Sequence, residues 1–313
     1  MNCIEKPCTA PGRIVAGIGV FDGVHLGHQA ILRAVREMAA ATGAAPAVIT
    51  FAPHPRAVLH PEEPPLLLMP QGKRFEILRN AGFLCWVIRF TQGFASLSPE
   101  AFLADLLHLG GCELAGVCVG ENWRFGKNGK GDCAFLSEYC NAHQIPFSAV
   151  PLVEVRGMTV SSSSIRTAAA NGRLADAAAM LGRSFRLYGK VVHGYRDASG
   201  KLSCPTANLE ISSGLLPPDG VYIAAVTLDN KRYPAAVNIG FSPTFRREKQ
   251  ARRVEVHVLD FNGSLYYEEL EVEILAHLRE ERIFGSPAEL KEQIDRDLAR
   301  IHNYFESEEE KHE

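Results

Sequence analysis

The sequence of 313 residues predicts a Rossmann-like α/β domain over residues 1–183 and an antiparallel β-barrel with a C-terminal helix over residues 184–313. Up to about residue 150, short apolar runs alternate with amphipathic runs, which is the pattern of a parallel sheet covered by helices. From Arg183 onward, β-type runs follow one another without helices between them, which is typical of a small barrel. The chain is long enough for two such domains.

Up to about residue 150, the first domain is expected to hold five strands and four helices, and Ala-rich helical sequence follows Arg166 as far as Leu181. The predicted strands are Ile14 to Val20, Ala47 to Phe51, Leu84 to Phe90, Leu114 to Val119 and Pro146 to Val150, and the predicted helices span about 28–42, 71–81, 98–109 and 132–143. Ser98 and Pro99 supply an N-cap and a proline at the first helical position of the third helix.

The second domain is expected to consist of short strands closed by one helix. The predicted strands are Leu187 to His193, Val221 to Leu228, Tyr233 to Ile239, Arg253 to Leu259 and Glu269 to Leu278, with turns at Pro217 to Gly220 and at Asn262-Gly263. Apolar residues at helical spacing predict a helix from Ser286 to about Tyr304. The charged tail from Glu306 is expected to be disordered.

Composition excludes several classes of protein. A net charge of −3 without a basic block gives no electrostatic footprint for nucleic acid. The N-terminal residues lack the apolar core of a signal peptide and no stretch has the length of a membrane span, so we expect a cytoplasmic chain without a membrane partner. The eight cysteines form no Cys-x-x-Cys pair, which argues against a zinc site and a disulfide framework.

The most informative motif joins the first predicted strand to the first predicted helix and reads Gly17-Ile-Gly-Val-Phe-Asp-Gly-Val-His-Leu-Gly-His28. Backbone N–H groups and the helix dipole at such a junction favour anions. We interpret His25 and His28 as hydrogen-bond donors to the phosphate oxygens of a nucleotide. A purely structural histidine pair at a helix start is the alternative. The absence of a following Gly-Lys-Ser or Gly-Lys-Thr excludes a P-loop.

Three further segments follow predicted strands of the same domain. The segment Thr50 to Pro55 is stiffened by prolines around a phenylalanine and a histidine, which suits a flat aromatic ligand, although a plain proline turn is the alternative. Phe90 to Phe94 would form a companion wall. In Gly120 to Gly126, Asn122 and Arg124 offer polar contacts, and two aromatic residues anchor the loop.

Hydroxyl groups precede two other predicted elements. The segment Val160 to Arg166 supplies serines before a helix and a fixed positive charge, which suits a polyphosphate, although simple N-capping is the alternative. In Pro205-Thr-Ala-Asn208, a hydroxyl and an amide two residues apart point to the same side of an extended segment and suit Mg²⁺ with its phosphate oxygens. A proline turn before a strand is the alternative there.

Taken in order, these motifs resemble those of the bacterial bifunctional riboflavin kinase/FAD synthetases. The resemblance implies an N-terminal nucleotidyltransferase domain that transfers an adenylyl group from ATP to FMN and releases pyrophosphate. It further implies a C-terminal riboflavin kinase domain that phosphorylates riboflavin with ATP. The ligands implied are therefore riboflavin, ATP, FMN and FAD, with Mg²⁺.

The resemblance also implies roles for individual residues. Glu255 would be the base that takes a proton from the ribityl 5′-hydroxyl, and His25, His28 and Arg166 would act in adenylyl transfer. ATP would be bound for adenylylation by Gly19, Phe21, Asp22, Gly23, Asn122, Arg124, Ser161, Ser162 and Ser163, and FMN by Phe51, Pro53, His54, Pro55, Phe90 and Thr91. The kinase nucleotide and flavin would be bound by Gly189, Val191, Gly194, Pro205, Tyr222, Asn238 and Arg279, and the metal by Thr206 and Asn208.

The chain departs from the family pattern at several positions. Asn122 stands where an aspartate is usual, Trp123 replaces a phenylalanine, and Ser163 replaces a threonine. Ser203 replaces a glycine, which costs about 1 kcal/mol if that position requires a positive φ. Two alternatives follow: a flavin- or nucleotide-binding protein derived from the enzyme with one site inactive, and a nucleotidyltransferase for another phosphorylated substrate.

Overall fold

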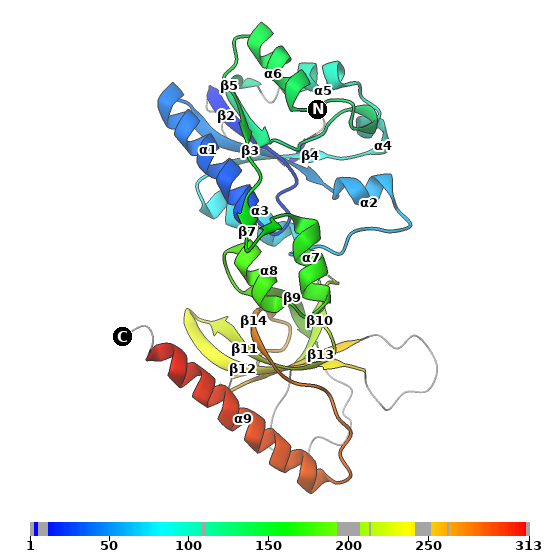
Figure 1. Ribbon diagram of the computed structural model, residues 1–313, viewed down its shortest axis with the longest axis vertical. Coiled ribbons are helices and arrows are strands. Elements are labelled where there is room, and N and C mark those ends of the chain that lie inside the picture. The colour runs from blue at the N-terminus through cyan, green and yellow to red at the C-terminus, as the bar shows by residue number, and fades with distance from the viewer. Residues whose placement is uncertain are drawn as a thin grey trace. The chain divides into compact units, whose positions relative to one another are not determined.

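The computed structural model describes residues 3–5, 12–107, 111–192, 207–212, 214–241, 252–261 and 263–310 (Figure 1). The chain forms two compact units, Met1–Ser164 and Ile165–Glu313. This division falls earlier than the predicted boundary between residues 183 and 184. The reason is that α8 (Leu174–Leu181) contacts β9 (Phe185–Val192) and β14 (Glu269–Arg279) and is therefore counted with the second unit.

The first unit is built on a six-stranded sheet with the order β1-β4-β3-β2-β5-β6. Its strands are β1 (Cys3–Glu5), β2 (Arg13–Ile18), β3 (Ala45–Ala52), β4 (Leu84–Arg89), β5 (Glu113–Gly120) and β6 (Phe147–Val150). The five predicted strands are confirmed and pair in parallel. The short β1 adds an antiparallel edge strand, which the sequence pattern did not predict. A two-stranded hairpin of β7 (Glu154–Val155) and β8 (Met158–Thr159) follows.

The predicted helices of the first unit are also confirmed. They are α1 (Leu26–Thr42), α3 (Gln71–Asn80), α5 (Pro99–Leu107) and α6 (Cys133–Ala142). Two helices that are too short for a periodic pattern were not predicted: α2 (Pro55–Leu59) and α4 (Gln92–Ala95), with the 3₁₀ turn η2 (Lys127–Gly129) after β5. Pro55 begins α2, so the proline segment after β3 is a strand end joined almost directly to a helix.

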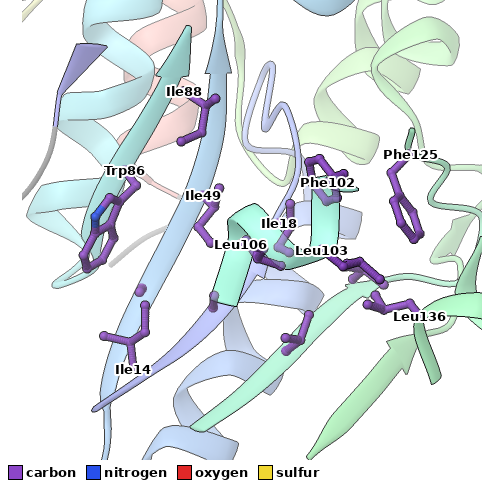
Figure 2. Packing of buried hydrophobic residues seen from close by; sticks show 14 of the residues in the cluster. Ile14, Ile18, Ile49, Trp86, Ile88, Phe102, Leu103, Leu106, Phe125 and Leu136 are labelled. Atoms are coloured by element: carbon purple, nitrogen blue, oxygen red, sulfur yellow. The ribbon is translucent and has the colours of Figure 1, made fainter. Parts of the chain in front are cut away.

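A cluster of buried apolar side chains fixes this sheet. Figure 2 shows Ile18, Ile49 and Trp86 from neighbouring strands, packed with Phe102 and Leu103 of α5. Because parallel strands are covered on both faces, their sequences are nearly continuous apolar runs. The carboxyl ends of the strands are therefore rigid supports for the loops that follow them.

The strand order places a topological switch at β2, because β3 lies on one side of it and β5 on the other. In open parallel sheets, ligands bind outside the carboxyl ends of the strands at such a point. The histidine motif (Gly17 to His28) lies at the end of β2, the proline segment (Thr50 to Pro55) at the end of β3 and the asparagine loop (Gly120 to Gly126) at the end of β5. The topology thus gathers three separate sequence motifs at one edge of the sheet.

The second unit is a closed antiparallel barrel with the order β10-β13-β12-β11-β14-β9. Its remaining strands are β10 (Ala207–Ile211), β11 (Gly220–Leu228), β12 (Lys231–Gly240) and β13 (Arg253–Val258). The predicted barrel is confirmed. Its closure leaves no unpaired edge among the named strands.

The C-terminal helix α9 (Pro287–Glu309) lies along the outer face of the barrel (Figure 1). Ile301 is fully buried there against Val221 and Ile223. The prediction that the tail is disordered from Glu306 is wrong, because the helix continues to Glu309. The Tyr304 hydroxyl donates a hydrogen bond to Glu308 (3.2 Å), and Arg232 of β12 lies 3.7 Å from the same carboxylate, which ties the last turns to the barrel.

Two further sequence predictions concern the described residues. Within the described ranges, no helix is both long enough and apolar enough to cross a membrane. Cys85, Cys112, Cys118, Cys133 and Cys140 are free thiols. Burial raises the pKa of Cys118 to about 12, as expected of a thiol that serves as a small apolar core residue.

We expect Ile301→Ala to destabilise the barrel unit by about 2–5 kcal/mol, because it leaves a cavity under α9. Hydrogen exchange of β11 and β14, measured by mass spectrometry, should become faster while exchange in β2 and β3 stays unchanged. Asp295→Ala, an exposed change on the same helix, is the control. Equal exchange rates in both variants would show that α9 does not support the barrel.

Candidate active sites

The loop between β2 and α1 has a strained backbone. Phe21 (φ 58°), Gly23 (φ 84°) and Val24 (φ 41°) all lie in the left-handed region. For phenylalanine and the β-branched valine this conformation is unfavourable, and it persists only where the surroundings enforce it. Such strain concentrates at functional sites.

Three side chains from outside this loop, and the Asp22 side chain within it, hold the loop. The Thr50 hydroxyl donates to the carbonyl of Val20 (3.1 Å), and the Gln29 amide donates to the carbonyl of Val24 (3.1 Å). The Ser162 hydroxyl donates to the Asp22 carbonyl (2.9 Å), and both Asp22 carboxylate oxygens accept from the backbone N–H of Leu68 (3.1 and 3.2 Å).

The side chains of Phe21 and Asp22 thus support the loop from within the protein, since both are buried. Gly19 also contributes through its backbone, because its N–H donates to the carbonyl of Ile49 at 3.1 Å. Gly19, Phe21 and Asp22, three residues predicted to bind ATP, therefore shape the loop. Because the Phe21 side chain is buried, only its backbone could contact a ligand.

The loop delivers the two histidines to the start of α1. His25 is the N-cap of that helix, and its Nδ1 accepts a hydrogen bond from the backbone N–H of His28 (3.3 Å). This bond fixes the proton of a neutral His25 on Nε2. The imidazole rings stack with their centroids 3.6 Å apart and an interplanar angle of 18°. A Cβ at Gly27 would come within 3.2 Å of the His25 ring, so glycine allows this close approach.

His28 is held as a neutral imidazole. Burial, the neighbouring His25 and the Arg74 guanidinium together lower its pKa well below the ordinary value of 6.5. Its Nδ1 is buried without a hydrogen-bond partner among the described residues. A neutral histidine supports an anion by hydrogen bonding, and the positive charge has to come from other groups.

An aromatic cluster follows β3 and β4. Phe51 packs against Phe90 and Phe94 with ring centroids 5.9 and 6.0 Å away, and Thr91 caps the short helix α4. Beside it, an open cavity of about 530 Å³ is lined by His54, Pro55, Arg56, Leu59, His60 and Glu63. Nδ1 of His54 accepts from the backbone N–H of Arg56 (3.1 Å), so this histidine caps α2. Pro53 follows β3 directly through a cis peptide bond.

The loop after β5 is anchored as predicted. The rings of Trp123 and Phe125 stack 4.6 Å apart, and Phe125 is buried against Phe102. Arg124 lies 3.2 Å from the Asp132 carboxylate. Asn122 sits at the carboxyl end of β5, where its short side chain faces Gly120.

The serine segment has mixed roles at the start of α7 (Ser162–Ala170). Ser161 accepts from the backbone N–H of Ser164 (3.0 Å), so the capping interpretation is correct for this residue. Ser162 supports the Asp22 loop, as described above, and the hydroxyl of the exposed Ser163 has no partner among the described residues. Arg166 follows in the second turn of the helix.

In the barrel, three predicted residues form a row across neighbouring strands. Asn208 of β10 pairs with Glu255 of β13, which pairs with Asn238 of β12, which in turn pairs with Val221 of β11. Directly paired residues lie on the same face of a sheet. Because Val221 packs under α9, the row lies on the outer face of the barrel.

Glu255 is half-buried in this row. Burial raises the pKa of its carboxyl, and the Glu281 carboxylate raises it further, whereas Arg253 acts in the opposite direction. Glu281 lies against the backbone of Gly240, where a Cβ would overlap its carboxylate. A carboxylate with a raised pKa is a better proton acceptor in its ionised form.

Arg279 belongs to the same face, because it pairs with Val221 across β11 and β14. Its Nε donates to Asp297 of α9 (2.8 Å), and its Nη1 donates to the carbonyl of Glu280 (3.0 Å). Gln293 donates to the other oxygen of Asp297 (2.7 Å). Asp297 and Gln293, 5% and 8% exposed, are the buried polar residues of the described part of the second unit, and neither was predicted.

The remaining kinase residues are placed differently. Tyr222 lies inside the barrel, and its hydroxyl donates to the carbonyl of Pro218 (2.6 Å). Gly189 permits the close approach of β9 to β10, since a Cβ there would lie 2.5 Å from the Glu210 carbonyl oxygen. Val191 is also buried and lines a cavity of about 100 Å³ with Ala207, Val256, Val258, Phe261, Gly263, Ser264, Leu265 and Tyr266. Gly194, Ser203, Pro205 and Thr206 lie outside the described residues.

Comparisons with known proteins agree with this arrangement. The FAD synthetase family matches residues 8–164, and the riboflavin kinase family matches residues 181–305. The chain is 37% identical over 294 residues to the bifunctional riboflavin kinase/FMN adenylyltransferase of Pseudomonas fluorescens, covering 91% of each chain. It is 33% identical over 296 residues to the protein of that name from Bacillus subtilis strain 168, covering 93% of this chain and 92% of the relative.

A solved structure shares the whole fold. The crystal structure described as a macrolide-efflux protein from Streptococcus pneumoniae superposes with a TM-score of 0.82 at 29% identity, covering 94% of this chain and 95% of that one. That description refers to the other protein. With both family matches in order and relatives that span nearly the full length, the chain belongs to the bifunctional riboflavin kinase/FMN adenylyltransferases, the enzymes of flavin cofactor biosynthesis that use ATP.

Proposed function

We propose that adenylyl transfer takes place at the loop between β2 and α1. The observation that carries this proposal is the strained backbone that holds His25 and His28 at the start of a helix, at the topological switch of the sheet. The phosphate of FMN attacks the α-phosphorus of ATP in line, and pyrophosphate leaves. No protein nucleophile is needed, so catalysis consists of positioning and stabilisation of charge.

Within this step, we assign hydrogen-bond donation to the histidines and positive charge to other groups. His28 is neutral, so it stabilises the phosphate oxygens through its N–H. The N-terminus of α1 adds its free backbone N–H groups. Arg166 supplies a fixed positive charge by its sequence position in the serine segment. The aromatic cluster of Phe51, Phe90 and Phe94 supports the flavin side, with Pro53, His54 and Pro55 beside it.

We infer that riboflavin is phosphorylated on the outer face of the barrel. Glu255 accepts the proton of the ribityl 5′-hydroxyl while that oxygen attacks the γ-phosphorus of ATP. Support comes from the row that sets Glu255 between Asn208 and Asn238, and from the raised pKa of its carboxyl. Arg279, held by Asp297, would position the flavin or the nucleotide at the end of the same row.

The donor set on this face fits Mg²⁺. Asn208 offers an amide oxygen next to the Glu255 carboxylate, and Thr206 adds a hydroxyl two residues earlier in the sequence. Mg²⁺ prefers such oxygen ligands and keeps several waters and phosphate oxygens in its shell. When bound, it would neutralise charge on the transferred phosphoryl group. The cytoplasmic location expected from the sequence stays a prediction.

Of the two alternatives raised by the sequence, a different phosphorylated substrate is not supported, because both families match in order. An inactive site in one unit is tested by incubating the protein with riboflavin, ATP and Mg²⁺ and separating FMN from FAD. Both products are expected. FAD from added FMN, without FMN from riboflavin, would indicate a silent kinase.

We expect His28→Ala to lower FAD formation by about 10²-fold or more, because one oriented donor to the phosphate oxygens is lost. FMN should still accumulate from riboflavin at the normal rate. Chromatographic separation of the two flavins from one reaction measures both steps at once. Loss of both steps with an intact fold would contradict the division of labour.

We expect Glu255→Gln to lower riboflavin phosphorylation by about 10²–10⁴-fold, the usual contribution of a general base, while added FMN is still converted to FAD. The wild-type rate should fall as the pH drops through the raised pKa of Glu255, because only the carboxylate accepts a proton. The acid limb of the kinase profile should therefore lie above the ordinary glutamate pKa of about 4.3. A limb at or below that value would argue against Glu255 as the base.

We expect Asp297→Asn to raise the KM of the kinase for riboflavin or ATP by about ten-fold, because a charge-assisted hydrogen bond that orients Arg279 is weakened. FAD formation from FMN in the same chain should not change. Glu292→Gln, an exposed change on the same helix, is the matched control. An unaltered KM for both substrates would show that Arg279 needs no support from α9.

A further inference from the structure

The described buried polar and charged residues of the first unit gather around one loop. They are Asp22, His25, Thr50 and Arg74. The first three belong to the strained loop or bond to it, as described above. Arg74 comes from α3, and it is the buried cation among the described residues of the chain, with 2% of its surface exposed. Burying an arginine side chain costs free energy of desolvation unless its charge is paired and hydrogen-bonded.

The guanidinium of Arg74 has a defined geometry. Its Nη2 donates to the carbonyl of Phe51 at the end of β3 (3.2 Å), and its Cζ lies over the ring of Phe75, 5.0 Å from the ring centroid. Its Nε is buried and has no hydrogen-bond partner among the described residues. Arg74 therefore fixes the end of β3, whose Phe51 packs against Phe90 and Phe94.

Arg74 also interacts electrostatically with Asp22 and His28. Burial lowers the pKa of Arg74 to about 10, and the attraction of the Asp22 carboxylate opposes that effect, so the side chain stays charged at neutral pH. Asp22 is itself 1% exposed, and both oxygens of its carboxylate accept from the backbone N–H of Leu68. On the other side of the loop, Arg74 is one of the groups that lower the pKa of His28.

We propose that Arg74 is a positioning residue for adenylyl transfer: its buried guanidinium balances the Asp22 carboxylate behind the strained loop and holds the end of β3, so that His25, His28 and the aromatic wall keep one mutual geometry. This inference rests on the proposed role of the histidines. Without the cation, the buried Asp22 carboxylate would lose the positive charge that attracts it, and the loop would be held less firmly.

The test compares Arg74→Met, which keeps an unbranched apolar stem and removes the charge, with Arg74→Lys, which keeps the charge. In Arg74→Met, kcat for FAD formation should fall by about 10²-fold, the loss that a displacement of about 1 Å produces at a reacting centre. Arg74→Lys should recover a large part of kcat. Phosphorylation of riboflavin by the same molecules should remain at the wild-type rate. Arg79→Met, on the exposed side of α3, is the matched control.

A second readout separates positioning from stability. The pKa of His28, followed by NMR of the imidazole nitrogens, should rise in Arg74→Met and stay low in Arg74→Lys, because a cation near His28 disfavours the imidazolium. In the double variant Asp22→Asn/Arg74→Met, removal of both charges should restore part of the kcat lost in Arg74→Met, since neither partner is left uncompensated.

The outcomes are distinct from those that test the histidines. Wild-type kcat and an unchanged pKa of His28 in Arg74→Met would overturn this inference alone. A variant whose first unit unfolds, with no recovery in the double variant, would show that Arg74 serves stability only and would also overturn it. If His28→Ala leaves FAD formation intact, the proposed function of the loop fails, whatever Arg74 does.

Discussion

The first unit depends on one constraint: a backbone that is unfavourable by itself has to be kept in place by its surroundings. The left-handed conformations of Phe21 and Val24 aim the two histidines, and four hydrogen bonds from β3, α1, the Leu68 segment and the start of α7 enforce them. Each of these bonds is buried or partly buried, where it is stronger than in water. The rigid parallel sheet keeps the groups that form these hydrogen bonds in fixed positions.

The second unit positions its proposed site residues by strand pairing. The proposed reactive row is set by strand register, since Asn208, Glu255 and Asn238 lie directly across from one another. The buried polar pair on α9 then orients Arg279 at the far side of Val221. In both units, the described polar residues that are fully buried lie at the sites, which fits the rule that buried polar groups are retained where they are satisfied and useful.

Much of this could be predicted from the sequence. The strands and long helices follow from apolar periodicity and the histidine motif from its position between the first strand and the first helix, whereas the role of Glu255 was implied by the family resemblance. Arg74 and Asp297 could not be assigned roles, because they lie within helices, and the helical pattern of apolar residues does not show which polar side chains are buried. The inward direction of Asp22 depends on Leu68, which lies far along the chain. The short helices α2 and α4 gave no periodic signal.

Strand register in the barrel has a consequence for how the kinase half can fail. Side chains alternate between the two faces of a strand, so a slip of β13 by one residue would turn Glu255 into the barrel interior and bring Val254 or Val256 to the outer face. Closure of the barrel forbids such a slip, because every strand is pinned on both sides. Correct strand pairing is therefore a requirement of the proposed role of Glu255, and we expect changes far from Glu255 that loosen the closure to abolish phosphorylation while every proposed site residue is still present.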